Sequence, residues 1–311
     1  MTTHQQVTFL SDGARCAATH VVGSGTAFLG DRGRPCVVMA HGFGGTRDTG
    51  LDDYVEGFAA AGLDVFVFDY RGFGDSDGSP RQRVSYRDQR DDYRAAIAAA
   101  RDISGVDPER IVLWGTSYSG GHVVPVAAHD PRVAAVLSLT PAMDGLAALG
   151  AIARRHPRML LALVGHGLRD GFRAITRRRP HLMPIVGMPG TTSMISAAGA
   201  FEGYHELAGP TWRNEVCARA ALAVAFNRPI RSASRLRVPM LVQIGETDAV
   251  APPAAAHRAA QQADGFANVL TYPVDHFDVY QGVWQQQILA DQIKFLSQHA
   301  STHRSRERLA R

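Results

Sequence analysis

The sequence predicts an α/β domain built around a mostly parallel β-sheet. Short apolar runs alternate along the 311 residues with longer segments of helical periodicity. These runs are apolar at nearly every position rather than at alternate positions, which indicates strands covered by helices on both faces of the sheet. The predicted strands are residues 36–40, 65–68, 111–114, 133–139, 240–245 and 269–272.

An antiparallel hairpin is predicted ahead of this alternating pattern. The opening segment reads VTFLSDGARCAATHVVG, in which a Ser-Asp-Gly turn signal separates two β-prone runs. Such a hairpin can add antiparallel strands at one edge of the sheet.

Helices are predicted between the strands. Residues 51–61 end at Gly62, a helix stop signal, and residues 85–103 begin at Ser85 with Asp88 three positions on, a weak capping-box pattern. Further helical patterns cover residues 119–129, 252–263 and 283–298.

One long segment departs from the alternation. Residues 142–230 contain no convincing strand and are rich in Ala, Gly, Arg and Met, with several prolines. A stretch of this kind between two strands of an α/β sheet predicts an inserted, largely helical cap. The predicted division is a first part of the core at 1–141, the cap at 142–230, a second part of the core at 231–300 and a basic, flexible tail at 301–311.

Composition and charge narrow the class of protein. With 45% hydrophobic and 20% charged residues, the chain is typical of a globular protein with a sizeable core. The formal net charge is only +4, and no zinc-finger spacing, RNP aromatics or basic heptads accompany the arginines, so nucleic acid is not an expected partner. The longest apolar stretch is interrupted by Pro141 and Asp144, so no membrane insertion is predicted.

Cysteine usage and the N-terminal residues predict a cytoplasmic setting. The three cysteines are an odd number, lie far apart and form no C-x-x-C, which argues against a disulfide framework and against a cysteine-based zinc site. The segment MTTHQQVTFL has neither the basic nor the apolar region of a secretory signal.

The stretch GTSYSGG, residues 115–121, contains two serines that each fit half of the G-x-S-x-G pattern of a hydrolytic nucleophile. Ser117 has the leading glycine, Gly115, whereas Ser119 has only the trailing one, Gly121. Because the apolar run ends at Trp114, Ser117 falls on the strand-to-helix turn and Ser119 in the first turn of the helix that follows. Ser117 is therefore the predicted nucleophile.

A nucleophilic serine needs a base and an acid that orients the base. The chain has 13 histidines, and His276 is distinguished from the others because it follows the last predicted strand. Asp248, just past the strand that ends near Ile244, is the predicted acid. Glu246 in the same loop and Asp144 after the preceding strand remain alternatives.

Two backbone amides are the predicted oxyanion donors. The glycine-rich segment HGFGG begins at His41, and the residue after His-Gly is Phe43; its partner is Tyr118, directly after the nucleophile. No local metal-ligand spacing such as H-E-x-x-H involves His41, Asp69 or His276, so neither a metal nor another cofactor is expected.

With these segments in order, the chain resembles the α/β-hydrolase superfamily over nearly its whole length. The matching segments are HGFGG (41–45), FDYRGFGDSDG (68–78), GTSYSGG (115–121), GETD (245–248) and DHF (275–277). Within the superfamily it is most similar to bacterial esterase-like hydrolases and to the related fungal polyketide-transferase-like group, apart from Ser119 in place of the second elbow glycine.

The resemblance implies an eight-stranded sheet with a helical cap between its sixth and seventh strands. It also implies acyl transfer, in which Ser117 attacks a carbonyl, His276 moves the proton, Asp248 holds the imidazole, and the Phe43 and Tyr118 amides stabilise the oxyanion. In the loop at 68–78, Tyr70 or Arg71 is a candidate for substrate contact, although a structural role is favoured.

The leading functional hypothesis is a carboxylester hydrolase that acts on a small to medium, largely apolar acyl compound. An acyltransferase or thioester-acting enzyme would use the same residues, and a non-catalytic ligand receptor on this fold is a third hypothesis. No acidic pair dedicated to binding a substrate amine is visible, which disfavours a peptidase. The expected partner is a small ester or acyl substrate, and the sequence leaves a homodimer open.

Overall fold

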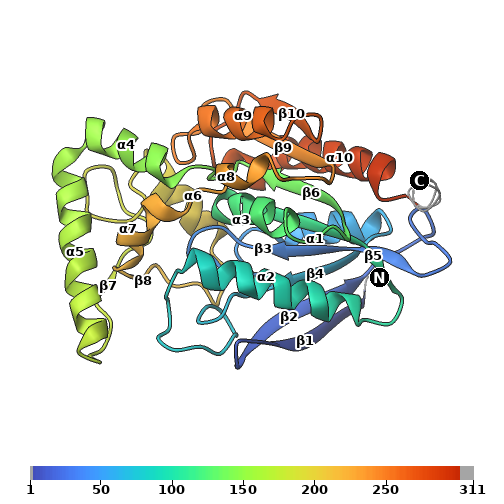
Figure 1. Ribbon diagram of the computed structural model, residues 1–311, viewed down its shortest axis with the longest axis horizontal. Coiled ribbons are helices and arrows are strands. Elements are labelled where there is room, and N and C mark those ends of the chain that lie inside the picture. Colours follow the sequence, from blue (N-terminus) through green and yellow to red (C-terminus); the bar gives the residue numbers. More distant parts are fainter. Residues whose placement is uncertain (1–2, 302–311) are drawn as a thin grey trace.

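The computed structural model describes residues 3–301, and most of the predicted tail at 301–311 lies outside the described residues. An eight-stranded sheet runs through the molecule in the order β1-β2-β4-β3-β5-β6-β9-β10 (Figure 1). The hairpin strands pair antiparallel at one edge, and β2 joins β4 antiparallel, whereas all other neighbours are parallel. The strands are β1 (Thr3–Ser11), β2 (Ala14–Val22), β3 (Arg34–Ala40), β4 (Asp64–Phe68), β5 (Val106–Thr116), β6 (Val133–Leu139), β9 (Met240–Gly245) and β10 (Ala267–Tyr272).

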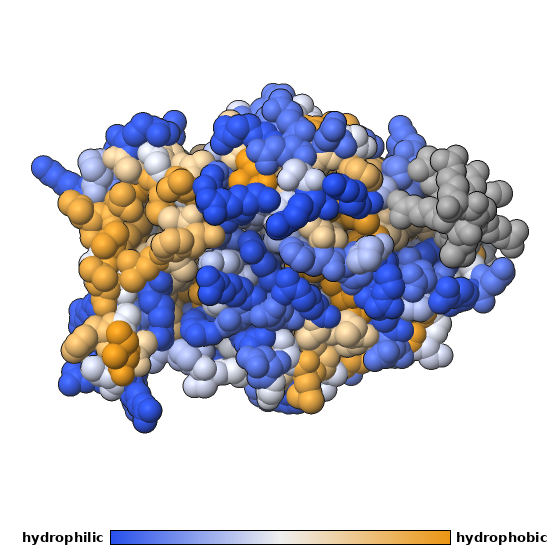
Figure 2. All heavy atoms as spheres, in the orientation of Figure 1, coloured by the Kyte–Doolittle hydropathy of each residue, from blue (hydrophilic) through white to orange (hydrophobic). Residues whose placement is uncertain are grey.

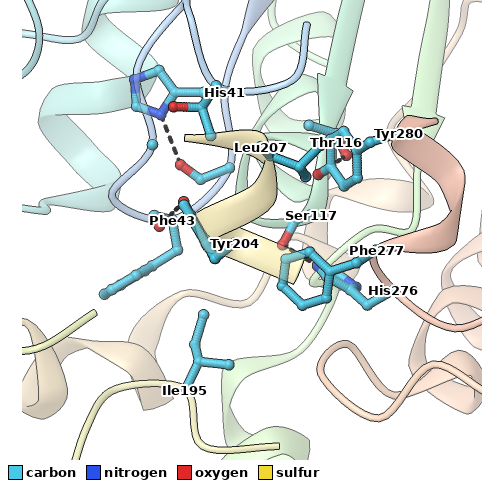
Figure 3. A pocket seen from close by; sticks show the side chains of 13 residues that line it. His41, Phe43, Thr116, Ser117, Ile195, Tyr204, Leu207, His276, Phe277 and Tyr280 are labelled. Atoms are coloured by element: carbon cyan, nitrogen blue, oxygen red, sulfur yellow. Dashed lines mark hydrogen bonds between the residues drawn. The ribbon is translucent and has the colours of Figure 1, made fainter. Parts of the chain in front are cut away.

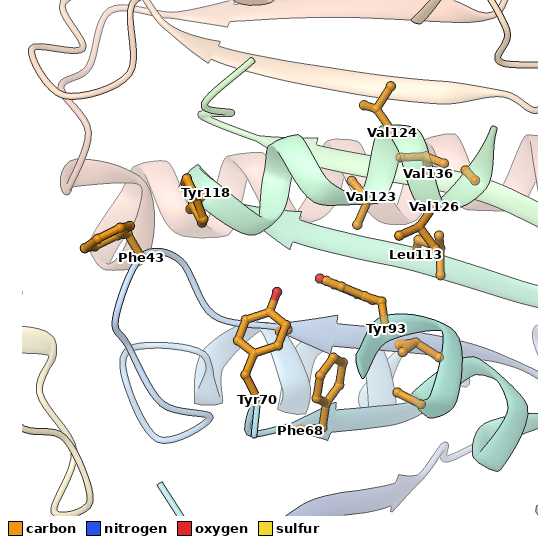
Figure 4. Packing of buried hydrophobic residues seen from close by; sticks show 14 of the residues in the cluster. Phe43, Phe68, Tyr70, Tyr93, Leu113, Tyr118, Val123, Val124, Val126 and Val136 are labelled. Atoms are coloured by element: carbon orange, nitrogen blue, oxygen red, sulfur yellow. The ribbon is translucent and has the colours of Figure 1, made fainter. Parts of the chain in front are cut away.

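Helices cover both faces of the sheet, as the continuous apolar runs predicted. Successive strand residues such as Val37 and Val38 point into two separate buried clusters. One cluster contains side chains of α1 (Asp52–Ala60) and α10 (Gly282–His299). The other contains side chains of α2 (Tyr86–Arg101), α3 (Ser117–Ala127), α8 (Ile230–Ala233) and α9 (Pro253–Gln262), and Figure 4 shows part of its packing.

About half of the segment between β6 and β9 is helical, and the segment extends beyond one end of the sheet (Figure 1). Besides α8, which packs on the sheet, its helices are α4 (Gly145–Arg155), α5 (Pro157–Ile175), α6 (Ala200–Leu207), α7 (Ala220–Ala223) and the 3₁₀ turn η1 (Val224–Phe226). The expectation of no strand here was slightly wrong, because β7 (Leu182–Met183) and β8 (Val216–Cys217) form a short antiparallel pair. Two residues per strand leave no periodicity for a sequence pattern to reveal.

The strand before Ser117, the predicted nucleophile, is longer than its apolar run suggested. The run at 111–114 lies inside β5, which continues to Thr116, and α3 begins at Ser117 rather than at residue 119. The turn therefore has no loop residues of its own. No helix within residues 3–301 has the length and apolar character needed to cross a membrane.

A buried chain of polar side chains joins the sheet to α10. The Trp114 indole Nε1–H donates to Gln292 Oε1 at 3.1 Å, and Gln292 Nε2 donates to Gln243 Oε1 at 2.6 Å. Gln243 Nε2 in turn donates to the Tyr272 hydroxyl and to the Ile288 carbonyl. Since buried polar groups are costly when unpaired, this chain fixes how α10 packs on β5, β9 and β10.

Replacing Gln292, the central residue of these hydrogen-bonded side chains, tests how much they contribute to the stability of the fold. Gln292→Leu removes two partners at once and leaves the Trp114 N–H and the Gln243 oxygen buried without their hydrogen bonds. The free energy of unfolding should fall by about 2–5 kcal/mol, measured by chemical denaturation. Gln286→Leu on the exposed side of α10 is the matched control and should change it by less than about 0.5 kcal/mol. Equal effects of the two substitutions would contradict this account.

Candidate active site

The turn from β5 into α3 holds Ser117 in a strained backbone conformation. Its φ is 56°, in the left-handed region that non-glycine residues rarely occupy. The chain packs tightly around this turn, because a Cβ on Gly115 would lie 2.4 Å from the Ser119 carbonyl oxygen and one on Gly121 would lie 2.4 Å from the Ala142 carbonyl oxygen. The glycines of the motif thus permit the close contacts that hold Ser117 in place.

Ser119 has a different position from Ser117. Its side chain is completely buried, and its Oγ accepts the Thr116 N–H at 2.9 Å. The same hydroxyl lies 2.8 Å from the Ala40 carbonyl oxygen and 2.9 Å from that of Thr116, either of which can accept its proton. Ser119 therefore ties the turn to the end of β3, and it is Ser117 whose side chain lines the adjoining pockets.

A continuous hydrogen-bonded row connects the three residues predicted as nucleophile, base and acid. His276 Nε2 lies 3.0 Å from Ser117 Oγ, and His276 Nδ1 lies 2.7 Å from Asp248 Oδ2. The three side chains come from the β5–α3 turn and from the loops after β9 and β10, and all are buried. Figure 3 shows the Ser117 oxygen directed toward His276 beside Phe277. The structure thus brings together segments 28 and 159 residues apart.

Asp248 is fixed by more than the imidazole. Its Oδ1 accepts the N–H groups of Val250 at 2.8 Å and Ala251 at 2.7 Å. This leaves Oδ2 directed at His276 Nδ1. A carboxylate held in this way orients the imidazole so that its other nitrogen faces the serine.

Asp275 was missed by the sequence reasoning, although it lies next to His276. One of its carboxylate oxygens accepts both the His276 N–H at 2.7 Å and the Ala249 N–H at 2.9 Å. Asp275 therefore bridges the loop that carries the histidine and the loop that carries Asp248. The only signal in the sequence was its place directly before the histidine.

Neither alternative acid contacts His276. Asp144 caps α4 through the Leu146 N–H and pairs with Arg228 through two 2.9 Å bonds. Burial opposes ionisation of Asp144, but the Arg228 guanidinium holds the pKa of its carboxyl below the usual value. Glu246 is exposed on the loop after β9.

The two residues predicted to supply oxyanion donors, Phe43 and Tyr118, line one space together with Ser117. The Tyr118 amide belongs to the first turn of α3, where N–H groups have no partner within the helix. Phe43 lies in the loop after β3, and its ring packs edge-on against the Tyr118 ring with centroids 5.3 Å apart. The Tyr204 hydroxyl of α6 donates to the Phe43 carbonyl at 2.7 Å, so the cap helps to hold this loop. The role of the two amides stays a prediction.

Two spaces meet at Ser117. A narrower one of about 420 Å³ lies toward His41, Tyr204 and Tyr280. A larger one of about 740 Å³ extends under α4 and is open to solvent. Its walls are mainly apolar, and Phe43 and Ile195 border both spaces.

The loop at 68–78 has the structural role that was favoured for it. Tyr70 is buried and packs edge-on against His41, and Arg71 pairs with Asp92 and with Asp12. Neither side chain borders the two spaces at Ser117. Within residues 3–301 no cluster of three or more His, Cys, Asp or Glu side chains is arranged to hold a metal ion.

Comparison with known proteins identifies the family. A family model described as serine aminopeptidase, S33, matches residues 31–273. The chain belongs to this family of α/β hydrolases. It is 40% identical to the quorum-quenching protein AidA of Acinetobacter baumannii (strain MDR-ZJ06) over 264 residues, which are 84% of this chain and 86% of that protein.

A second relative in sequence and a solved structure are also similar to this α/β hydrolase. The thiohydrolase AneE of Aspergillus aculeatus is 30% identical over 200 residues, 62% of this chain and 58% of that protein. The crystal structure of the α/β hydrolase GrgF from Penicillium sp. sh18 superimposes with a TM-score of 0.79 at 22% identity and covers 96% of this chain and 99% of that one. The eight-stranded sheet with its helical layers is therefore the α/β-hydrolase fold.

Two buried histidines near the site give a pH dependence to stability. Burial lowers the pKa of His41 to about 4 and holds the pKa of His122 well below its usual value. Below pH 6.5 the unfolded chain binds protons at these residues that the folded chain does not, so the free energy of unfolding falls as the pH drops.

Each of the two histidines should lower the free energy of unfolding by about 1.5 kcal/mol when the pH falls from 6.5 to 5. Chemical denaturation of the native protein and of His122→Phe at both pH values measures the difference. The variant should lose less stability over this interval than the native protein. An identical loss in both would show that His122 is not kept neutral by burial.

Proposed function

We propose that the protein is a serine hydrolase that cleaves carboxylic ester bonds through Ser117, His276 and Asp248. The observation that carries this proposal is the hydrogen-bonded row from Asp248 through His276 to Ser117, whose hydroxyl borders both spaces. The family supports acyl chemistry in general terms, and the roles of the individual residues are inferred from the geometry.

The reaction follows from the contacts. Ser117 Oγ attacks the substrate carbonyl carbon while His276 Nε2 takes the hydroxyl proton, and Asp248 stabilises the imidazolium that results. The Phe43 and Tyr118 amides are the proposed donors to the oxyanion that forms. The imidazolium then gives its proton to the leaving alcohol as the carbonyl re-forms, which leaves an acyl group on Ser117. A water molecule repeats the sequence, with His276 as base, and releases the acid.

The larger space supports an apolar acyl compound of small to medium size as the substrate. Met143, Ile152, Met194 and Val224 form much of its wall. Among the residues that border either space, the single acidic side chain besides the catalytic row is Asp144, and it is paired with Arg228. A substrate ammonium group would find no unpaired carboxylate there, which favours esters over the aminopeptidase substrates in the family's description.

Acyl transfer to an acceptor other than water is the second candidate. Relatives are named thiohydrolase, polyketide transferase and acyltransferase, and one is named a quorum-quenching protein. The narrower space beside Ser117 and His276 has room for about one water molecule, so an acceptor alcohol, amine or thiol would have to approach Ser117 through the larger space. A small acyl substrate and a cytoplasmic setting are part of the proposal, and the three buried, unpaired cysteines support a reducing compartment.

Labelling with a fluorophosphonate distinguishes the two serines. The reagent should modify the native protein and the Ser119→Ala variant, and it should not modify Ser117→Ala, because only Ser117 has its hydroxyl beside the imidazole. Ser119→Ala should also lose about 1–3 kcal/mol of stability, since the Thr116 N–H loses its partner. Labelling that persists in Ser117→Ala, or that is missing from the native protein, would contradict the catalytic role.

A panel of p-nitrophenyl esters and matching thioesters of graded acyl length tests hydrolysis against transfer. Each substrate is assayed with and without alcohol, amine and thiol acceptors, and both free acid and acyl-acceptor product are quantified. The hydrolase proposal predicts release of free acid at a rate that acceptors do not change. Acyl-acceptor product in place of free acid would overturn the hydrolase in favour of the transferase.

A further inference from the structure

Helix α5 carries an apolar stripe on the surface of the molecule. Leu161, Val164, Leu168, Phe172 and Ile175 follow one another at intervals of three or four residues and are between 38% and 84% exposed. Such spacing places all five on one face of the helix. Figure 2 shows an apolar patch at the end of the molecule that α5 occupies in Figure 1.

The opposite face of α5 already has its packing partners. Leu163, Gly167 and Asp170 are buried, and a Cβ on Gly167 would lie 2.7 Å from Leu222. The stripe is therefore additional to the face that anchors the helix to the cap. Contiguous exposed apolar patches of this kind mark interaction surfaces more often than scattered single residues do.

The charges around the stripe have one sign. Residues 154–179 include eight arginines and a single acidic residue, Asp170. That carboxylate is buried, pairs with Arg219 and accepts the His181 N–H. The surface presented by α5 and its two ends is consequently basic, with an apolar centre.

This combination matches an anionic lipid surface better than a second copy of the chain. By helical geometry Arg158, Arg169 and Arg173 lie along one flank of the stripe. Antiparallel packing of two α5 helices about a two-fold axis would bring these flanks to the same side and make them repel. A nucleic acid would attract the arginines but would leave the apolar side chains exposed to water.

We propose that α5 docks the protein on membranes that contain anionic phospholipids. The helix would lie in the plane of the interface, with its stripe at the boundary between headgroups and acyl chains and its arginines among the phosphates. This is surface binding without insertion. A single residue, His156, separates α5 from α4. Helix α4 borders the larger space through Gly145, Ala148 and Ile152. The surface that binds the membrane would therefore lie next to the part of the cap that forms the wall of the larger space.

Vesicle co-sedimentation tests the proposal independently of the catalytic one. The 311-residue protein is pelleted with vesicles of phosphatidylcholine alone and of phosphatidylcholine mixed equally with phosphatidylglycerol. Binding should require the anionic lipid and should weaken with added salt. Leu168→Ser/Phe172→Ser and, separately, Arg154→Gln/Arg155→Gln/Arg158→Gln should each weaken binding by about tenfold or more.

Matched controls replace exposed side chains away from α5. Leu10→Ser/Val283→Ser removes two apolar groups of similar exposure, and Arg32→Gln/Arg258→Gln removes two exposed arginines. Neither control should change vesicle binding. All variants should keep the native circular dichroism spectrum, and the two variants of α5 and the end of α4 should keep the native rate on a water-soluble short-chain ester, whatever that rate is.

Several outcomes would overturn the membrane proposal. Equal binding to both kinds of vesicle would show that anionic lipid is not required. Absence of binding to either kind would show that the surface does not bind membranes. A dimer in light scattering that Leu168→Ser/Phe172→Ser dissociates, with no vesicle binding, would assign the stripe to a second copy. Binding of a nucleic-acid duplex that needs the arginines but not the apolar side chains would assign the surface to that polyanion.

Discussion

The left-handed backbone of Ser117 is the constraint on which the candidate site depends. A non-glycine residue in this region costs on the order of 1–3 kcal/mol, and the surrounding packing must supply that energy. Gly115 and Gly121 allow backbone segments to approach closely, and the Ser119 hydroxyl connects the turn to the end of β3. The result is a serine at the end of a strand whose hydroxyl lies 3.0 Å from the His276 imidazole, as the proposed nucleophile requires.

The parallel sheet supplies the other half of the arrangement. Since β3, β5, β9 and β10 run in the same direction, the loops that follow them gather at one edge, where ligands bind in open α/β sheets. Asp275 joins two of these loops. The buried hydrogen bonds from Trp114 through Gln292 to Gln243 hold α10 against the same strands. The cap reaches the same edge through Tyr204 and Ile195. The contacts that position the predicted catalytic residues are thus continuous with the packing of the sheet, α10 and the cap.

Features with a local signature could be predicted from the sequence, whereas those set by distant partners could not. Apolar runs and turn residues were enough for the eight main strands and for five of the six helices that pack on the sheet; the four-residue helix α8 had no recognisable pattern. The position of Ser117 on the turn followed from where the apolar run ended, although β5 continues to Thr116 and α3 begins two residues earlier than its pattern suggested. The bond from Ser119 to Ala40 and the pairing of Asp144 with Arg228 depend on chain segments 79 and 84 residues away, which no local pattern records.

The central claim is that the substrate's acyl group becomes covalently bound to Ser117 during turnover. The most direct measurement is to quench the protein with acid during turnover of a p-nitrophenyl ester and to locate the added acyl mass by peptide mass spectrometry. The account predicts the acyl mass on Ser117 in the peptide that contains residues 115–121, at a level that rises and then declines as substrate is consumed. Acyl mass on Ser119, or turnover of the ester with no acyl mass on this peptide at any time, would contradict it.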